Sequence, residues 1–114
     1  MNVLLGISGG IAAYKSAYLA REFVKRGDEV RCVMTEGAQE FITPLTLQAL
    51  TDNRVGTETF DASYESEIGH IDLARWADVV LIAPATANVI GRVAGGLGDD
   101  LLTTVLLATR APIV

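Results

Sequence analysis

An uninterrupted apolar run, "DVVLIAP" at Asp78–Pro84, constrains the fold more than any other feature of the chain. Strands that are apolar at nearly every position, and not at every second one, are typical of parallel sheets that helices cover on both faces. Val3–Ile7 is a shorter run, Glu29–Met34 is predicted as a further strand, and Pro112–Val114 begins another. The sequence therefore predicts a mostly parallel sheet.

Segments with helical features separate these strands. A helix is expected from about Gly10 to Arg26, because apolar side chains recur there at helical spacing and Gly27 provides a C-terminal stop. The other expected helical segments are Ala38–Ile42, Pro44–Leu50, His70–Trp76, Ala85–Val93 and about Asp100–Thr109.

Two finer expectations concern the end and the middle of the chain. Asp99 is predicted to cap the last helix. Thr51–Glu67 is predicted as a loop, with a short strand near Val55 or Phe60. Because strands alternate with helices throughout, the pattern indicates an α/β fold.

Composition and charge limit the classes of function. The 114 residues are enough for one domain, and a net charge of −5 without a cluster of Lys and Arg argues against nucleic-acid binding. The chain has one cysteine, Cys32, so no disulfide can form within it. With only one histidine besides, a Cys/His metal site is unexpected. Cys32 lies in an apolar stretch, where we expect it to be a buried packing residue.

Location and domain extent are also predicted from the sequence. Met1–Leu5 is too short and uncharged for a secretory signal, and no apolar run reaches membrane-spanning length. A cytoplasmic globular protein without membrane association is therefore expected. Because the chain stops within an expected strand, at "RAPIV", residues 1–114 are expected to be a single domain truncated at its C-terminal end.

In a parallel α/β sheet, ligands bind beyond the carboxyl ends of the strands. Three predicted loops occupy such ends: Ser8–Gly10, Thr35–Gly37 and Pro84–Asn88. These loops form the candidate site.

The first loop, within "GISGGIAAYKS", nearly matches three motifs. The dinucleotide fingerprint fails at Ser8 and Ile11, and the P-loop motif fails at Tyr14, where it needs glycine. The G-x-S-x-G nucleophile elbow is matched formally, but Ser8 has too little chain before it for the strand that completes such a site.

A simpler interpretation of this loop is an anion site at a helix start. Free N–H groups and the helix dipole favour a phosphate, Gly9 and Gly10 permit its close approach, and Ser8 adds a hydroxyl. The alternative is a tight turn in which Ser8 only caps the helix. The residues alone leave both interpretations open.

Other candidate residues have similar alternatives. His70 suits proton transfer near neutral pH, but a lone histidine is more often a packing or surface residue. The small residues at 85–87 leave room for a flat ligand, and Asn88 offers it a donor and an acceptor. The paired acids Asp99 and Asp100 are more typical of caps than of a metal site.

Three stretches together resemble one known family: "GISGGIAAYKS", "MTEGAQEFITPLTLQAL" and "GHIDLARWADVVLIAPATANVIGRVAGGLGDDLLTT". In this order they resemble the flavin-dependent cysteine decarboxylases (HFCD flavoproteins), and within that family the phosphopantothenoylcysteine decarboxylases. The resemblance implies a doubly wound, flavodoxin-like or Rossmann-like sheet with helices on both faces, and FMN as the cofactor.

The resemblance also implies roles for particular residues. His70 matches the family's active-site histidine, and no metal is implied. Asp99 and Asp100 match an acidic pair that either contacts the flavin or acts as a cap. The residues that the resemblance places at FMN are Ser8, Gly9, Gly10, Ile11, Thr35, Phe41, Ala85, Thr86, Ala87, Asn88 and Asp99.

The implied activity is decarboxylation of 4′-phosphopantothenoylcysteine to 4′-phosphopantetheine in coenzyme A biosynthesis. FMN carries the redox chemistry, and His70 assists proton removal. Family members form trimers, or dodecamers built from trimers, with FMN at a subunit boundary. The family's substrate-carboxylate motif and flap cysteine are expected beyond Val114. The alternatives are a flavoprotein that decarboxylates a peptide's C-terminal cysteine, and a non-catalytic FMN-binding or regulatory subunit.

Overall fold

The computed structural model describes residues 1–57 and 69–114. Its sheet consists of β1 (Asn2–Ile7), β2 (Glu29–Met34) and β3 (Val79–Ile82), all parallel, in the order β2-β1-β3. Residues 112–114 run beside β3, and the N–H groups of Val80 and Ile82 donate to their carbonyls, each over 2.9 Å. The parallel sheet and the extended segment at 112–114 are therefore as expected.

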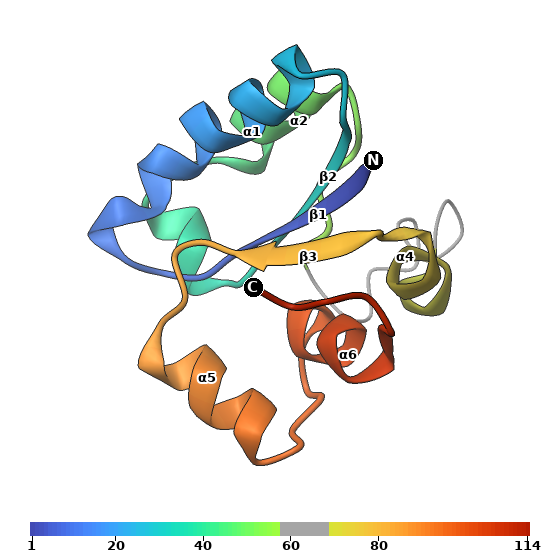
Figure 1. Cartoon of the computed structure of the whole chain (residues 1–114). Coiled ribbons are helices and arrows are strands. Elements are labelled where there is room, and N and C mark those ends of the chain that lie inside the picture. The colour runs from blue at the N-terminus through green and yellow to red at the C-terminus, as the bar shows by residue number, and fades with distance from the viewer. Residues whose placement is uncertain (58–68) are drawn as a thin grey trace.

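Helices cover both faces of this sheet (Figure 1). The helices α1 and α2 lie on one face, and α4, α5 and α6 lie on the other. The helical segments are η1 (Ile11–Tyr14), α1 (Lys15–Lys25), η2 (Gly37–Glu40), α2 (Pro44–Thr51), α4 (His70–Trp76), α5 (Ala87–Ala94) and α6 (Leu101–Ala108), where η marks a 3-10 helix. The predicted doubly wound α/β class is confirmed.

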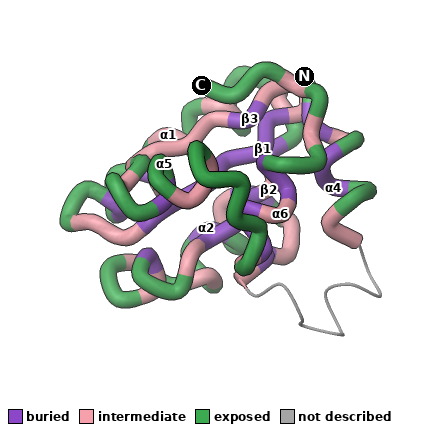
Figure 2. The backbone as a smooth tube through the Cα atoms, turned by 90° about the horizontal axis from the view of Figure 1, so that it is seen from below, coloured by how far each residue is buried: buried purple, intermediate pink, exposed green. Residues whose placement is uncertain are grey.

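Alternate residues of β1 supply the two halves of the core. Leu4 packs into the cluster on the α4 and α6 side, whereas Leu5 and Ile7 pack into the cluster on the α1 and α2 side. Most of β1, β2 and α6 is buried, whereas β3 is mostly intermediate, and Figure 2 shows the buried strands inside the molecule. Gly6 lets α6 approach closely, because a Cβ atom there would lie 2.7 Å from Cδ1 of Leu102.

The expected boundaries are wrong at two helix starts. The helix expected from Gly10 begins as a 3-10 turn at Ile11 and becomes α-helical only at Lys15. The helix expected from Ala85 begins two residues later, because Thr86 is its N-cap. Gly27, with φ of 92°, follows the C-cap residue Arg26 and ends the helix α1 as expected.

The predicted cap of the last helix is also wrong by one residue. Asp100, and not Asp99, caps α6, and its Oδ1 accepts a hydrogen bond from the Thr103 N–H over 2.8 Å. The Thr103 hydroxyl accepts in return from the Asp100 N–H, which completes a capping box. The spacing to Thr103 decides which acid caps the helix.

The expected loop after α2 is described only in part. Gly56, next to Val55, makes a single parallel bridge with Val33. The alternative strand position near Phe60 lies outside the described residues. Within residues 1–57 and 69–114, none of the helices has the length and apolar character needed to cross a lipid bilayer.

Candidate active site

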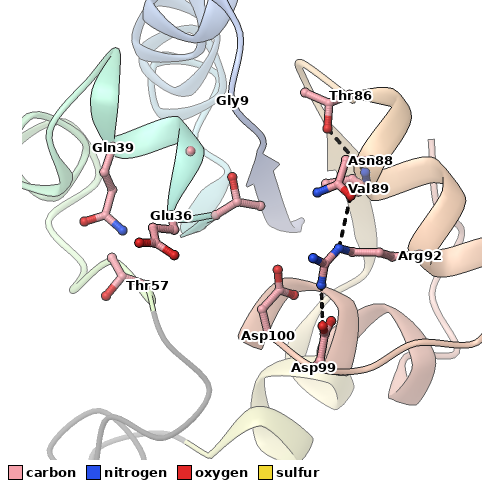
Figure 3. A pocket seen from close by; sticks show the side chains of 12 residues that line it. Gly9, Glu36, Gln39, Thr57, Thr86, Asn88, Val89, Arg92, Asp99 and Asp100 are labelled. Atoms are coloured by element: carbon pink, nitrogen blue, oxygen red, sulfur yellow. Dashed lines mark hydrogen bonds and ion pairs between the residues drawn. The ribbon is translucent and has the colours of Figure 1, made fainter.

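A cleft of about 730 Å³ lies at the carboxyl ends of the strands (Figure 3). All three predicted loops contribute to it, and its volume is in the range typical of small-molecule sites. The residues that line it are Gly9, Thr35, Glu36, Gly37, Gln39, Thr57, Thr86, Asn88, Val89, Arg92, Asp99 and Asp100.

One wall of the cleft is built by close packing of two backbone segments. A Cβ atom on Gly9 would lie 2.9 Å from the carbonyl carbon of Gly37. The Thr35 N–H donates to the carbonyl of Ile7 over 3.0 Å, and this bond continues the β1–β2 pairing into the loop. We call Gly9 with Thr35–Gly37 the backbone wall.

The turn after β1 leaves backbone donors open. Within the described part of the chain, the N–H groups of Gly9 and Gly10 donate to no protein acceptor. A Cβ atom on Gly10 would meet only the Pro84 ring, at 3.9 Å. The turn leads into η1 and α1, so its open N–H groups and the helix dipole together favour an anion.

The opposite wall is built by the start of α5 and the loop before α6. The Thr86 hydroxyl accepts from the Val89 N–H over 3.3 Å and thereby caps α5. One turn further along α5, Arg92 Nε donates to Asn88 Oδ1 over 3.2 Å. This contact leaves the Asn88 Nδ2 hydrogens as donors for the cleft. We call Asn88, Arg92 and Asp99 the charged wall.

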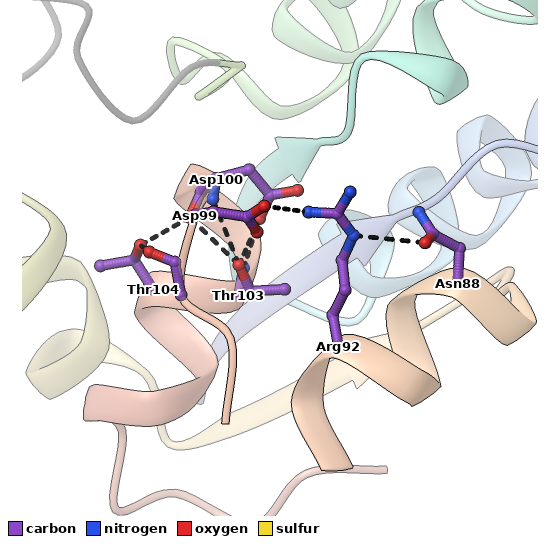
Figure 4. Close-up of polar contacts among 7 residues, drawn as sticks. Asn88, Arg92, Asp99, Asp100, Thr103 and Thr104 are labelled. Atoms are coloured by element: carbon purple, nitrogen blue, oxygen red, sulfur yellow. Dashed lines mark hydrogen bonds and ion pairs between the residues drawn. The ribbon is translucent and has the colours of Figure 1, made fainter. Parts of the chain in front are cut away.

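Arg92 and Asp99 are paired at the edge of the charged wall (Figure 4). Arg92 Nη1 donates to Asp99 Oδ2. This hydrogen bond lowers the pKa of Asp99 below its usual range and raises the pKa of Arg92. Since Glu36 and Asp100 also line the cleft, its described lining carries three carboxylates and one guanidinium.

Ser8 lies behind the cleft and not in its lining. It is 1% exposed, and its hydroxyl donates to the carbonyl of Pro84 and accepts from the Thr86 N–H. The single hydroxyl hydrogen therefore has a protein acceptor, and the turn offers an anion its backbone N–H groups instead. Burial of Ser8 also argues against its use as the nucleophile of a hydrolase.

The structure brings some of the expected site residues together and leaves others apart. Gly9, Thr35, Thr86, Asn88 and Asp99 line the cleft. The other expected residues do not line it, namely Ser8, Gly10, Ile11, Phe41, Ala85, Ala87 and His70. Their roles stay predictions.

Several lining residues were missed from the sequence. Glu36 lies in a loop that was predicted to form the site, and Arg92 follows Asn88 by four residues in a predicted helix. That spacing places two side chains on one helix face, so it is a signal that could have identified Arg92. Gln39 and Thr57 carry no comparable signal, because their position depends on how η2 and the residues after α2 pack.

Fold and cleft together define a class of protein. In the strand order β2-β1-β3, the chain first adds β2 on one side of β1 and then adds β3 on the other side, so the direction of winding changes between β1 and β3. A ligand cleft at such a switch point is typical of doubly wound nucleotide-binding proteins. A family model described as Flavoprotein matches residues 1–114, so the chain belongs to this family. The family resemblance expected from the sequence is confirmed.

Comparisons with individual proteins agree with this family assignment. The chain is 59% identical over 112 residues to the coenzyme A biosynthesis bifunctional protein CoaBC of Vibrio cholerae. The match covers 98% of this chain, which spans only 28% of the length of that protein. It is 39% identical to a PPC decarboxylase variant solved with pantothenoylaminoethenethiol, with a TM-score of 0.80 over 98% of this chain and 63% of that one. The FMN-dependent cysteine decarboxylase TvaF from thioviridamide biosynthesis is 25% identical, with a TM-score of 0.86 over 99% of this chain and 70% of that one.

Proposed function

We propose that the chain binds FMN in the cleft and forms the flavin-binding part of a decarboxylase that converts 4′-phosphopantothenoylcysteine to 4′-phosphopantetheine and CO2. The observation that carries the proposal is the cleft at the strand ends, with open N–H groups at Gly9 and Gly10, in a chain that belongs to the Flavoprotein family. The similarity to CoaBC proteins supports the choice of substrate.

The residues of the cleft fit FMN. The N–H groups of Gly9 and Gly10 suit its phosphate, and the cleft volume of about 730 Å³ has room for a flat ring. Asn88 can donate to a ring acceptor through Nδ2 while Arg92 holds its Oδ1. When bound, FMN supplies an acceptor and donor of electrons that no amino-acid side chain provides.

His70 is proposed to remove a proton from the cysteine end of the substrate. It is the first residue of α4 and does not line the cleft of its own chain. We therefore propose that chains associate, as trimers or dodecamers, and complete the site at a subunit boundary. Large exposed apolar side chains support association, with Ile11 82% and Leu45 72% exposed. A cytoplasmic location is proposed as well, in keeping with the similarity to coenzyme A biosynthesis proteins.

A second candidate function is decarboxylation of a peptide's C-terminal cysteine. The similarity to TvaF favours it, because that protein is named as an FMN-dependent cysteine decarboxylase. The two candidates share the cofactor and the loss of CO2 from a terminal cysteine, and they differ in the group to which that cysteine is joined.

A direct experiment supplies FMN to the full-length protein, including any chain that follows Val114, and measures CO2 released from 4′-phosphopantothenoylcysteine and from a peptide that ends in cysteine. We expect release from the first substrate and little from the second. His70→Asn should keep FMN bound and lose turnover, because the substitution removes the proton acceptor and leaves the cleft lining unchanged. Bound FMN without CO2 from either substrate would contradict the proposed activity and favour a non-catalytic flavin-binding subunit.

A further inference from the structure

Ser8 joins two of the three loops that form the cleft. Its Oγ donates to the carbonyl of Pro84 over 2.5 Å and accepts from the Thr86 N–H over 2.8 Å. The Ser8 N–H also donates to the Pro84 carbonyl, over 3.1 Å. The partners lie 76 and 78 residues away in the sequence, so the turn after β1 and the turn after β3 are held by one side chain and its own backbone.

From this geometry we infer that Ser8 is a positioning residue, which fixes the start of α5 at the cleft and does not contact the ligand phosphate. The inference rests on the proposed flavin site. The contacts continue from Ser8 into the cleft, because the Thr86 N–H donates to Ser8 Oγ and the Thr86 hydroxyl caps α5. Asn88, two residues further on, lines the cleft.

The chemistry of the position favours serine. A hydroxyl donates and accepts at once, as the Pro84 carbonyl and the Thr86 N–H require. Alanine would remove the hydrogen bonds that the Ser8 hydroxyl makes with the Pro84 carbonyl and the Thr86 N–H. Loss of the Thr86 bond should cost more, because the Pro84 carbonyl still accepts from the Ser8 N–H. Since Ser8 is 1% exposed, a longer side chain would have to displace its neighbours.

A matched control is available in the same part of the chain. Ser16 is 2% exposed, and its Oγ donates to the Ala13 carbonyl over 2.6 Å. That contact stays within η1 and α1 and reaches no other loop. Ser8→Ala and Ser16→Ala therefore remove equally buried hydroxyls, of which only the first joins two loops of the cleft.

The binding test titrates the full chain and both variants with FMN and, separately, with riboflavin, which lacks the phosphate. For Ser8→Ala we expect the affinities for both ligands to fall by the same factor, about tenfold. Ser16→Ala should leave both affinities unchanged even if it lowers the melting temperature. A loss confined to FMN would overturn the inference, because it would mean that Ser8 contacts the phosphate. Unchanged affinities in Ser8→Ala would overturn it too.

A measurement without ligand keeps the inference testable if Ser8→Ala does not fold, or if the chain binds no flavin. In the wild-type chain, NMR should show slow amide exchange at Thr86, whose N–H donates to Ser8, and fast exchange at Ala87, the first residue of α5. Equal, fast exchange at both amides would show that the Ser8 bond is absent and would overturn the inference. Failure of wild-type flavin binding would contradict the proposed function alone.

Discussion

The two walls of the cleft are held by different forces. In the backbone wall, Gly9 packs directly against Gly37, and a loop N–H at Thr35 continues the pairing of two buried strands. In the charged wall, Asn88 and Asp99 are held through the Arg92 side chain, whose contacts are exposed to solvent. Close packing of backbone against backbone fixes one arrangement of the atoms. Exposed charge pairs contribute little to the free energy of unfolding, and their strength changes with salt and pH.

This difference suggests a division of tasks between the walls. The backbone wall has a shape that solvent conditions do not change, which suits a site for one invariant group such as a phosphate. The charged wall presents an amide and carboxylates on exposed side chains, and such groups can adjust when a ligand arrives. The following substitutions test whether the walls really differ in this way.

The largest effect is expected in the backbone wall. Gly9→Ala places a Cβ atom 2.9 Å from a backbone carbon of Gly37, which cannot move aside as a side chain can. We expect a loss of about 1–3 kcal/mol in the free energy of unfolding, measured with urea. Gly10→Ala is the control, since its Cβ would meet only Pro84 at 3.9 Å. Equal losses in the two variants would show that the Gly9–Gly37 contact is not what holds this wall.

A smaller effect is expected where the charged wall meets α6. Asp100→Ala removes the capping box with Thr103 and should lower the free energy of unfolding by about 1 kcal/mol. Asp99→Ala should lower it much less, because Asp99 is exposed and caps no helix. If thermal or urea unfolding ranked these two variants in the opposite order, the assignment of the cap to Asp100 would be wrong.

The charge pair of this wall should respond to pH and salt. The hydrogen bond from Arg92 lowers the pKa of Asp99, so the pair stabilises the fold at neutral pH, and this contribution is lost as the pH falls through the lowered pKa of the folded state. NMR titration of the Asp99 carboxyl should give a higher pKa in Arg92→Gln than in the wild type. The difference should shrink at high salt. An identical pKa in both proteins would mean that the pair does not form in solution.

The smallest change is expected at Cys32, which lies in β2 and packs in the core cluster on the α1 and α2 side. Burial raises the pKa of its thiol to about 12, so the reactive thiolate is scarce at neutral pH. The folded protein should react with a thiol reagent only as fast as it unfolds, and added urea should release the full reaction. Fast reaction in the native state would show that packing on this side is looser than the structure indicates.

The fold was predictable because its signals are local. Continuous apolar runs indicate strands covered on both faces, and the turn residues between them mark where loops lie at the strand ends. The helix starts were less predictable, since Thr86 and Asp100 become caps only through partners three residues further on. A choice between Asp99 and Asp100 required attention to Thr103.

The site was predictable at the level of loops and less so at the level of side chains. Gly9 and Asn88 were expected at the ligand and do line the cleft. Ser8 has the residue type of a phosphate contact, but its partners are in a loop far away in sequence, and no local pattern reveals such a bond. Gln39 and Thr57 reach the cleft only through tertiary packing.

The most direct test of the account is an absorption spectrum of the purified protein, combined with mass analysis of any released cofactor and a titration with added FMN. We predict flavin absorption, release of FMN, and rebinding of FMN by the stripped protein in a way that Gly9→Ala weakens more than Gly10→Ala. A colourless protein that takes up no added FMN would contradict the central claim that this cleft is a flavin site.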